Sequence, residues 1–141
     1  MRRMLIIVIL LVLPVSFAAL GQAAEKAEAK CSGLSSHSAM SFCINAEANE
    51  SDKKVLFKES EIIERLNKWN MDLEPKNVAI EKFNTATSQF KIWRNAQCNA
   101  KAALALGGSG SDPLYDLCRI EINEYRLVQL KAYKKELDSR N

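Results

Sequence analysis

Four cysteines are the residues of this chain whose spacing points most clearly to chemistry. Cys31, Cys43, Cys98 and Cys118 lie 12, 55 and 20 positions apart. A zinc site would need close C-x-x-C pairs or several histidines, and the chain has only His37. An even number of cysteines spread through a small domain instead predicts two disulfides. We therefore expect no bound metal and no cofactor.

Other groups that could take part in catalysis stand alone. No G-x-S-x-G, H-E-x-x-H or G-x-x-x-x-G-K-S motif occurs. Glu61 and Glu64 share one helical face, but paired carboxylates on such a face are usually solvated. His37 has no predictable partner that would make it a general base. The glycine-rich stretch 107–111 follows a predicted helix and has no lysine after it. We therefore expect that the protein is not an enzyme.

The start of the chain predicts export. Arg2 and Arg3 precede an apolar run from Met4 to Leu20, and small residues follow it. This order is typical of a secretory signal peptide, here residues 1–23, cleaved after Ala23 or alternatively after Ala18. A membrane anchor is the alternative, but the run is short for a span of about 20 residues and contains a proline. We expect a periplasmic or secreted protein that is free of the membrane after cleavage.

The net charge of the chain limits the classes of molecule that are expected to bind it. The whole chain carries a net charge of +3, from 20 basic and 17 acidic residues. Residues 1–23 contain two of the arginines and no acid, so the remainder is close to neutral. Nucleic acids and anionic membranes attract clustered positive charge, so neither is an expected partner.

The positions of apolar residues predict an all-α fold. Residues 24–34 have little to bury and are expected to form a flexible leader before a helical domain over residues 35–141. Within this domain we expect a disulfide-stapled, up-and-down bundle of three to four helices. The clearest helix starts near Pro75 and ends at Gly107, and its expected core seam consists of Ala79, Phe83, Ala86, Phe90, Trp93, Gln97, Ala100 and Leu104. The last helix is expected to start with Asp112 as N-cap and Pro113 at the first helical position.

A Cys98–Cys118 bond would fix the register of the last two helices. If these helices are antiparallel, Phe90 then faces Arg126 and Phe83 faces Tyr133, which suits a packed seam and a cation–π contact. The agreement supports this pairing and leaves Cys31 to bond with Cys43. The other two pairings remain open.

With these features the chain resembles the small exported lysozyme inhibitors of the LprI type. The resemblance rests on Cys31 and Cys43 with eleven residues between them, on Trp93-Arg94 four residues before Cys98, and on a Gly108-Ser109 loop. It continues through Cys118, followed by Arg126 and Leu130. Phe90 stands where the family usually has tryptophan. Phe90, Trp93, Arg94, Arg126 and Leu130 are thus expected scaffold residues.

The resemblance implies a protein partner, a lysozyme-like peptidoglycan hydrolase that this chain would bind and block. A rigid loop of Gly107, Gly108, Ser109, Gly110 and Ser111 could enter a lysozyme cleft, with Ser109 and Ser111 as contacts. A plain connection between helices is the competing interpretation of this loop. The alternative function is a non-catalytic envelope adaptor that binds another protein through a helix face.

Overall fold

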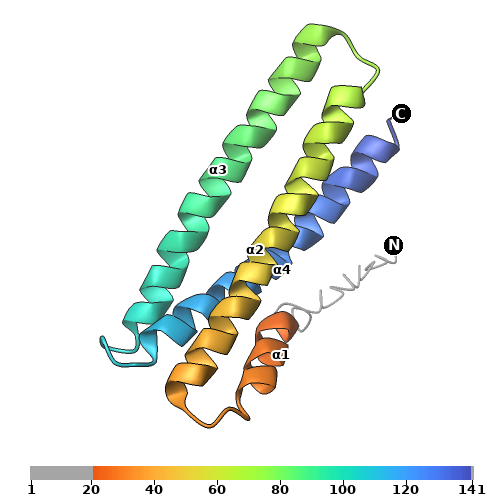
Figure 1. The fold of residues 1–141 in the computed structure, drawn as a ribbon. Helices are drawn as coiled ribbons and strands as arrows, with labels where there is room; N and C mark the ends of the chain where they lie inside the picture. The colour runs from red at the N-terminus through yellow and green to blue at the C-terminus, as the bar shows by residue number, and fades with distance from the viewer. Residues whose placement is uncertain (1–20, 141) are drawn as a thin grey trace, which may run out of the picture.

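Four helices form the bundle, and no strand occurs within the residues described. The computed structural model describes residues 21–140, so most of the predicted signal peptide lies outside it. The helices are α1 (Gln22–Cys31), α2 (His37–Lys68), α3 (Leu73–Ala103) and α4 (Ser111–Asp138). They run alternately down and up (Figure 1). The expected all-α, up-and-down architecture is confirmed.

Helices α2 and α4 each pack against all three other helices, and the contact between the two is the most extensive in the bundle. The main core lies between α2, α3 and α4 and contains Val55, Ile62, Leu66, Phe83, Leu130 and Leu137. A second, smaller cluster joins α1 to α2 and α4 through Ala27, Ala48 and Ile120. The long helix α2 begins after Ser36, whose hydroxyl accepts a hydrogen bond from the N–H of Ala39 at 3.1 Å.

The prediction of a flexible leader at residues 24–34 is wrong for most of that segment. Residues up to Cys31 belong to α1, and Ala27 and Cys31 are buried. The alanines of this segment were expected to bury little apolar surface. Their small side chains instead let α1 lie close to Ile120 and Leu117 of α4. The carboxylate of Glu124 accepts hydrogen bonds from the free N–H groups at the start of this helix.

Both disulfides form the pairs expected from the sequence. Cys31 is bonded to Cys43, with the Cα atoms 5.8 Å apart, and Cys98 is bonded to Cys118, with the Cα atoms 5.4 Å apart. The first bond ties α1 to α2, and the second fixes α3 against α4. In the part of the chain that the structure describes, no helix is long and apolar enough to span a membrane.

The long core seam expected on α3 is only partly correct. Phe83 is buried, but Trp93 is 47 % exposed and Leu104 is 77 % exposed. Ala86, Gln97 and Ala100 are also exposed. Helix α3 packs mainly on α4 and leaves much of its surface to solvent, so an apolar stripe as wide as predicted has no partner to cover it.

Candidate functional site

The connection between α3 and α4 is the best candidate for a contact with another molecule. It comprises residues 104–110, because α3 ends at Ala103, earlier than the predicted end at Gly107. Successive turns close it, with hydrogen bonds from the N–H of Leu106 to the carbonyl of Ala103 at 3.0 Å and from Gly108 to Ala105 at 2.9 Å. We call residues 104–110 the tip loop.

The tip loop presents two leucines to solvent. Leu104 is 77 % exposed and Leu106 is 94 % exposed, the largest exposed fraction among the large hydrophobic residues described. Leu106 has a φ of 51°, in the left-handed region that residues with a Cβ atom avoid. Gly107 follows with a φ of 73°, which glycine adopts without strain. A strained backbone that holds a leucine in water is typical of a binding site.

Several bonds hold the tip loop in place. The Cys98–Cys118 disulfide lies at its base. Nε2 of His37, at the start of α2, lies 2.6 Å from the carbonyl oxygen of Ser109. The hydroxyl of Ser111 donates a hydrogen bond to the carbonyl of Ala102 at 3.4 Å. His37 thus anchors the loop here, which is a structural role that the isolated residue did not reveal in the sequence.

Three backbone donors of the tip loop remain available. Among the hydrogen bonds of residues 21–140, none uses the N–H groups of Gly107, Ser109 or Gly110. The stretch 102–111 also contains no charged side chain. The loop can therefore enter a cleft without desolvating a charge, and it can donate hydrogen bonds to acceptors there.

A shallow hollow lies beside the loop, between the first turns of α2 and α4. Its lining includes Phe42, which is 78 % exposed, together with Ser38, Tyr115 and Asp112. Asp112 was expected to cap α4. Instead Gly110 is the N-cap and α4 begins at Ser111, two residues before the predicted first position at Pro113. Asp112 therefore lies in the first turn, where its charge interacts favourably with the helix dipole.

Beneath the tip, a polar network joins α2, α3 and α4. The carboxylate of Asp52 accepts hydrogen bonds from Arg94 at 2.6 Å, from Arg119 at 2.5 Å and from Asn123 at 2.6 Å. Arg94 also donates to Asn123 at 2.8 Å, and Arg119 donates to Asp116 at 2.7 Å. Each helix of the main bundle thus supplies a charged member, and the network fixes their relative positions.

Burial of Asp52 would by itself raise the pKa of its carboxyl group. The hydrogen bonds from Arg119 and Asn123 and the charges of Arg94 and Arg119 outweigh this effect, so the pKa lies below its ordinary value. Asp52 is therefore ionised at neutral pH and neutralises part of the charge of the two arginines.

A second buried ion pair lies further along the bundle. Arg126 donates to Glu59 at 3.0 and 3.1 Å and to the hydroxyl of Thr87 at 3.1 Å. Its guanidinium lies 5.0 Å from the ring centre of Phe90 and 5.9 Å from that of Phe83. The predicted contact between Phe90 and Arg126 is thus present in the structure.

The remaining predicted scaffold residues lie in different environments. Leu130 is in the core, with 1 % exposed. Phe83 packs edge-on against Tyr133, with ring centres 5.8 Å apart, as the register predicted. Trp93 contacts Phe90 from the solvent side at 6.2 Å between ring centres and is not a core residue. Arg94 is buried in the polar network.

Sequence reasoning missed the two leucines of the tip loop and the acidic partners of the arginines. The spacing of Leu104 matched the predicted core seam, so nothing in the sequence indicated that its side chain would be exposed. Leu106 immediately precedes two glycines, and a large apolar residue in a turn was the available sign of a contact. Asp52 and Arg94 are 42 residues apart in the sequence, so their pairing could not be predicted from the spacing of nearby residues.

Comparison with models of known protein families gives one match, the lysozyme inhibitor LprI, over residues 27–130. The chain belongs to the LprI lysozyme inhibitor family. The matched LprI region contains both disulfides, the tip loop and the polar network around Asp52. Comparisons with curated proteins and with solved structures gave no match.

Proposed function

We propose that this protein binds a lysozyme-like peptidoglycan hydrolase and blocks its substrate cleft with the tip loop. Membership of the LprI family supports inhibition as the activity. The observation that carries the choice of surface is Leu106, a strained and 94 % exposed leucine at the end of a disulfide-held loop. The proposed place of action is the periplasm or the medium, after removal of residues 1–23.

The chemistry of the loop is complementary to that of the cleft. A lysozyme cleft contains two carboxyl groups that flank the scissile bond, and one of them lies against apolar surface. Free N–H groups of Gly107, Ser109 and Gly110 can donate to those acceptors, and Leu104 and Leu106 can cover the apolar surface. Because the loop is already held by His37 and by the disulfide, little conformational entropy is lost on binding.

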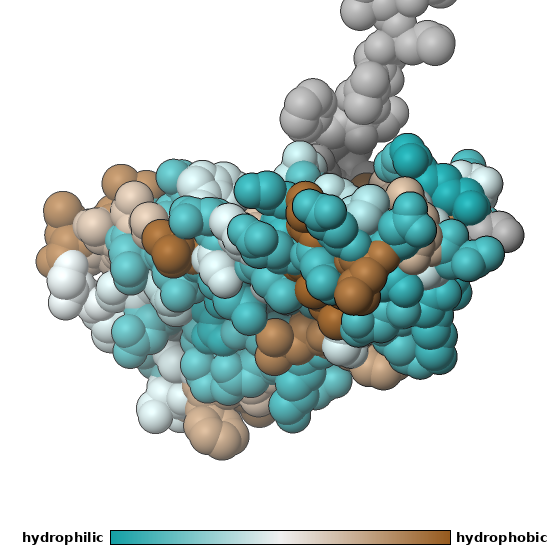
Figure 2. Space-filling view, turned by 90° about the horizontal axis from the view of Figure 1, so that it is seen from above, coloured by the Kyte–Doolittle hydropathy of each residue, from teal (hydrophilic) through white to brown (hydrophobic). Residues whose placement is uncertain are grey.

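A second candidate function is that of an adaptor that binds through the opposite end of the bundle. There Met71, Leu73 and Val78 are 42 %, 71 % and 48 % exposed, next to the half-buried Trp69. The face seen from above in Figure 2 carries its apolar side chains in separate groups among hydrophilic ones. No continuous apolar surface dominates this end of the bundle, where α2 connects to α3, which argues against a large adaptor contact there.

Lysis of peptidoglycan by lysozyme tests the proposal. The inhibitor is the oxidised chain from Ala24 onward, the proposed mature form, which keeps all of α1 except Gln22 and Ala23. We expect dose-dependent inhibition that is lost when Leu104 and Leu106 are both changed to serine. Burial of each leucine on binding would contribute about 1.5–3 kcal/mol, so the double change should weaken inhibition at least tenfold.

Leu73→Ser with Val78→Ser is the matched control, because it also removes two exposed apolar side chains. This control should inhibit as well as the unaltered chain. Equal loss in both variants, or unchanged inhibition by the tip variant, would reject the tip loop as the contact. Inhibition that is lost only in the control would favour contact through the opposite end.

A further inference from the structure

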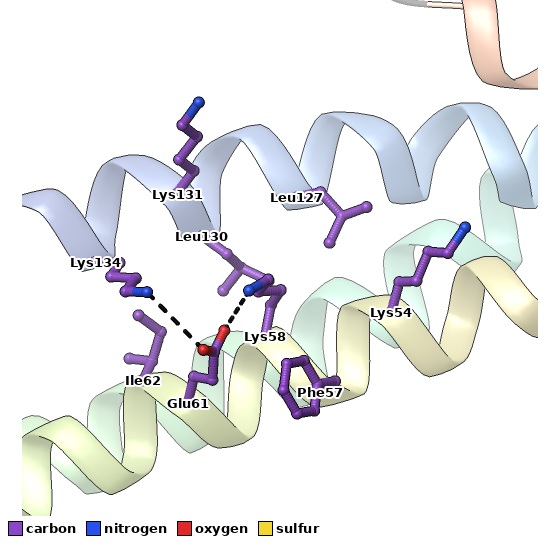
Figure 3. Close-up of a pocket in the computed structure, with 9 residues that line it drawn as sticks. All are labelled: Lys54, Phe57, Lys58, Glu61, Ile62, Leu127, Leu130, Lys131 and Lys134. Atoms are coloured by element: carbon purple, nitrogen blue, oxygen red, sulfur yellow. Dashed lines mark hydrogen bonds and ion pairs between the residues drawn. The ribbon is translucent and has the colours of Figure 1, made fainter.

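A groove with an apolar floor and a basic rim runs between α2 and α4, away from the tip loop. Its floor is formed by Ile62, Leu127 and Leu130 (Figure 3). Phe57 stands at one edge and is 61 % exposed. The lining also contains Glu61 and four lysines: Lys54, Lys58, Lys131 and Lys134. We call it the lysine groove.

The lysines are distributed along both walls. Lys54 and Lys58 extend from α2 and Lys134 extends from α4, and Figure 3 shows these three spread along the groove, whereas Lys131 on α4 points away from α2 and marks the outer edge of the lining. Glu61 is the one acidic residue among the lining residues. It accepts a hydrogen bond from Lys58 at 2.5 Å and lies 3.9 Å from Lys134.

With four lysines and one glutamate in its lining, the lysine groove carries an excess of positive charge. Within residues 21–140, Lys54 and Lys131 form no ion pair. The groove is therefore complementary to an occupant that is both negatively charged and apolar. None of the lining residues belongs to the tip loop, so the groove is distinct from the proposed inhibitory contact.

Helix α1 shows that the space between α2 and α4 can hold a helix. It occupies the adjoining part of the same α2–α4 valley, where Ala23 and Ala27 face Ile120 and Leu127. The two parts of the valley share Lys54 and Leu127. From Lys54 to Ile62 the lysine groove spans about 12 Å at 1.5 Å per residue, which is the length of two helical turns.

We propose that the lysine groove binds an acidic amphipathic helix of a partner protein. The apolar stripe of such a helix lies on Leu127 and Leu130 and against Phe57, and acidic side chains on both sides of the stripe meet the lysines of the two walls. An acyl chain carries its charge at one end, which does not match lysines placed along the whole groove. The distribution of charge thus favours a helix over a lipid.

Fluorescence anisotropy with a defined probe tests the proposal. The probe is a labelled 15-residue peptide with leucines at helical i, i+3, i+4, i+7 spacing and glutamates on both sides of them. Two control peptides have lysines in place of the glutamates, or the same composition in an order that destroys the apolar stripe. We expect the oxidised chain to bind the acidic amphipathic peptide alone, and more weakly as salt is raised.

Two variants locate the binding. Lys54→Glu with Lys131→Glu should weaken binding at least tenfold, and Phe57→Ser should weaken it without a change in charge at the rim. Lys82→Glu with Lys135→Glu makes the same change of charge outside the groove and should leave binding within twofold. All three variants should retain inhibition of lysozyme. A loss of peptide binding can therefore be distinguished from a loss of the inhibitory function.

Several results would overturn the proposal. Binding of the scrambled acidic peptide with equal affinity would show attraction by charge alone. Equal loss in the Lys82/Lys135 variant would place the contact elsewhere. Absence of peptide binding, together with sedimentation of the chain by vesicles of phosphatidylglycerol and phosphatidylcholine, would assign the groove to a lipid surface.

Discussion

Replacing Asp52 with asparagine should weaken the bundle without changing its shape. The carboxylate accepts three hydrogen bonds of 2.5–2.6 Å from Arg94, Arg119 and Asn123, and the side chain is 25 % exposed. A hydrogen bond to a charged group contributes about 1.5–3 kcal/mol. The amide keeps one acceptor oxygen and both arginines keep other partners, so we expect a net loss of about 3 kcal/mol in the free energy of unfolding.

Urea unfolding followed by circular dichroism measures this loss. With a slope of about 1.5 kcal/mol per molar urea, the midpoint of Asp52→Asn should fall by about 2 M while the slope stays the same. Glu64→Gln is the matched control, because it also removes one carboxylate from α2. Its ion pair with Lys68 is exposed and contributes little, so its midpoint should match that of the unaltered chain.

The same variant tests the direction of the pKa shift. Because the folded chain holds the pKa of Asp52 below its ordinary value of 3.8, the carboxylate stabilises the fold fully above that pH. This contribution is lost as the pH falls through the lower, folded value. The difference in midpoint should therefore be constant from about pH 5 to 8 and should narrow below about pH 4. An Asp52→Asn midpoint that does not differ from the control at pH 7 would refute the role of the network.

Other changes separate what stabilises the fold from what contacts a partner. Replacing Cys98 and Cys118 with serine should cost about 3 kcal/mol in chemical denaturation, since a bond across a sequence separation of 20 removes loop-closure entropy from the unfolded chain; a loss below about 1 kcal/mol would contradict this. Phe83→Ala should cost about 3–4 kcal/mol because the ring is buried against Tyr133, whereas Trp93→Ala should cost less than about 1 kcal/mol; similar thermal midpoints for the two would refute the packing described. Leu106→Gly relieves the positive φ and should leave stability unchanged or higher by up to about 1 kcal/mol, yet weaken inhibition of lysozyme.

Much of the fold follows from local signals in the sequence. The recurrence of apolar residues at steps of three and four marks the helices, and the glycines from residue 107 mark a helix end to within four residues, since α3 ends at Ala103. The register set by Cys98 and Cys118 placed Phe90 against Arg126 and Phe83 against Tyr133, because antiparallel helices keep the sum of facing positions constant.

The parts that could not be predicted depend on tertiary packing. The spacing on α3 identifies an apolar stripe, but whether Trp93 and Leu104 are covered depends on how closely the neighbouring helices approach. A charged residue such as Asp52 or Glu59 is usually solvated, and its burial becomes evident only when an arginine from another helix lies beside it. Helix α1 has weak apolar character and gains its burial from α4, which lies about 90 positions away in sequence.

Competition with a cleft ligand tests the central claim most directly. Binding of the oxidised chain to lysozyme is measured by calorimetry, with and without saturating tri-N-acetylglucosamine, which occupies the substrate cleft. Cleft insertion of Leu106 predicts that the sugar and the chain exclude one another, so the apparent Kd rises in proportion to the sugar concentration. An apparent Kd that is unchanged by the sugar, in a complex that still forms, would contradict the account.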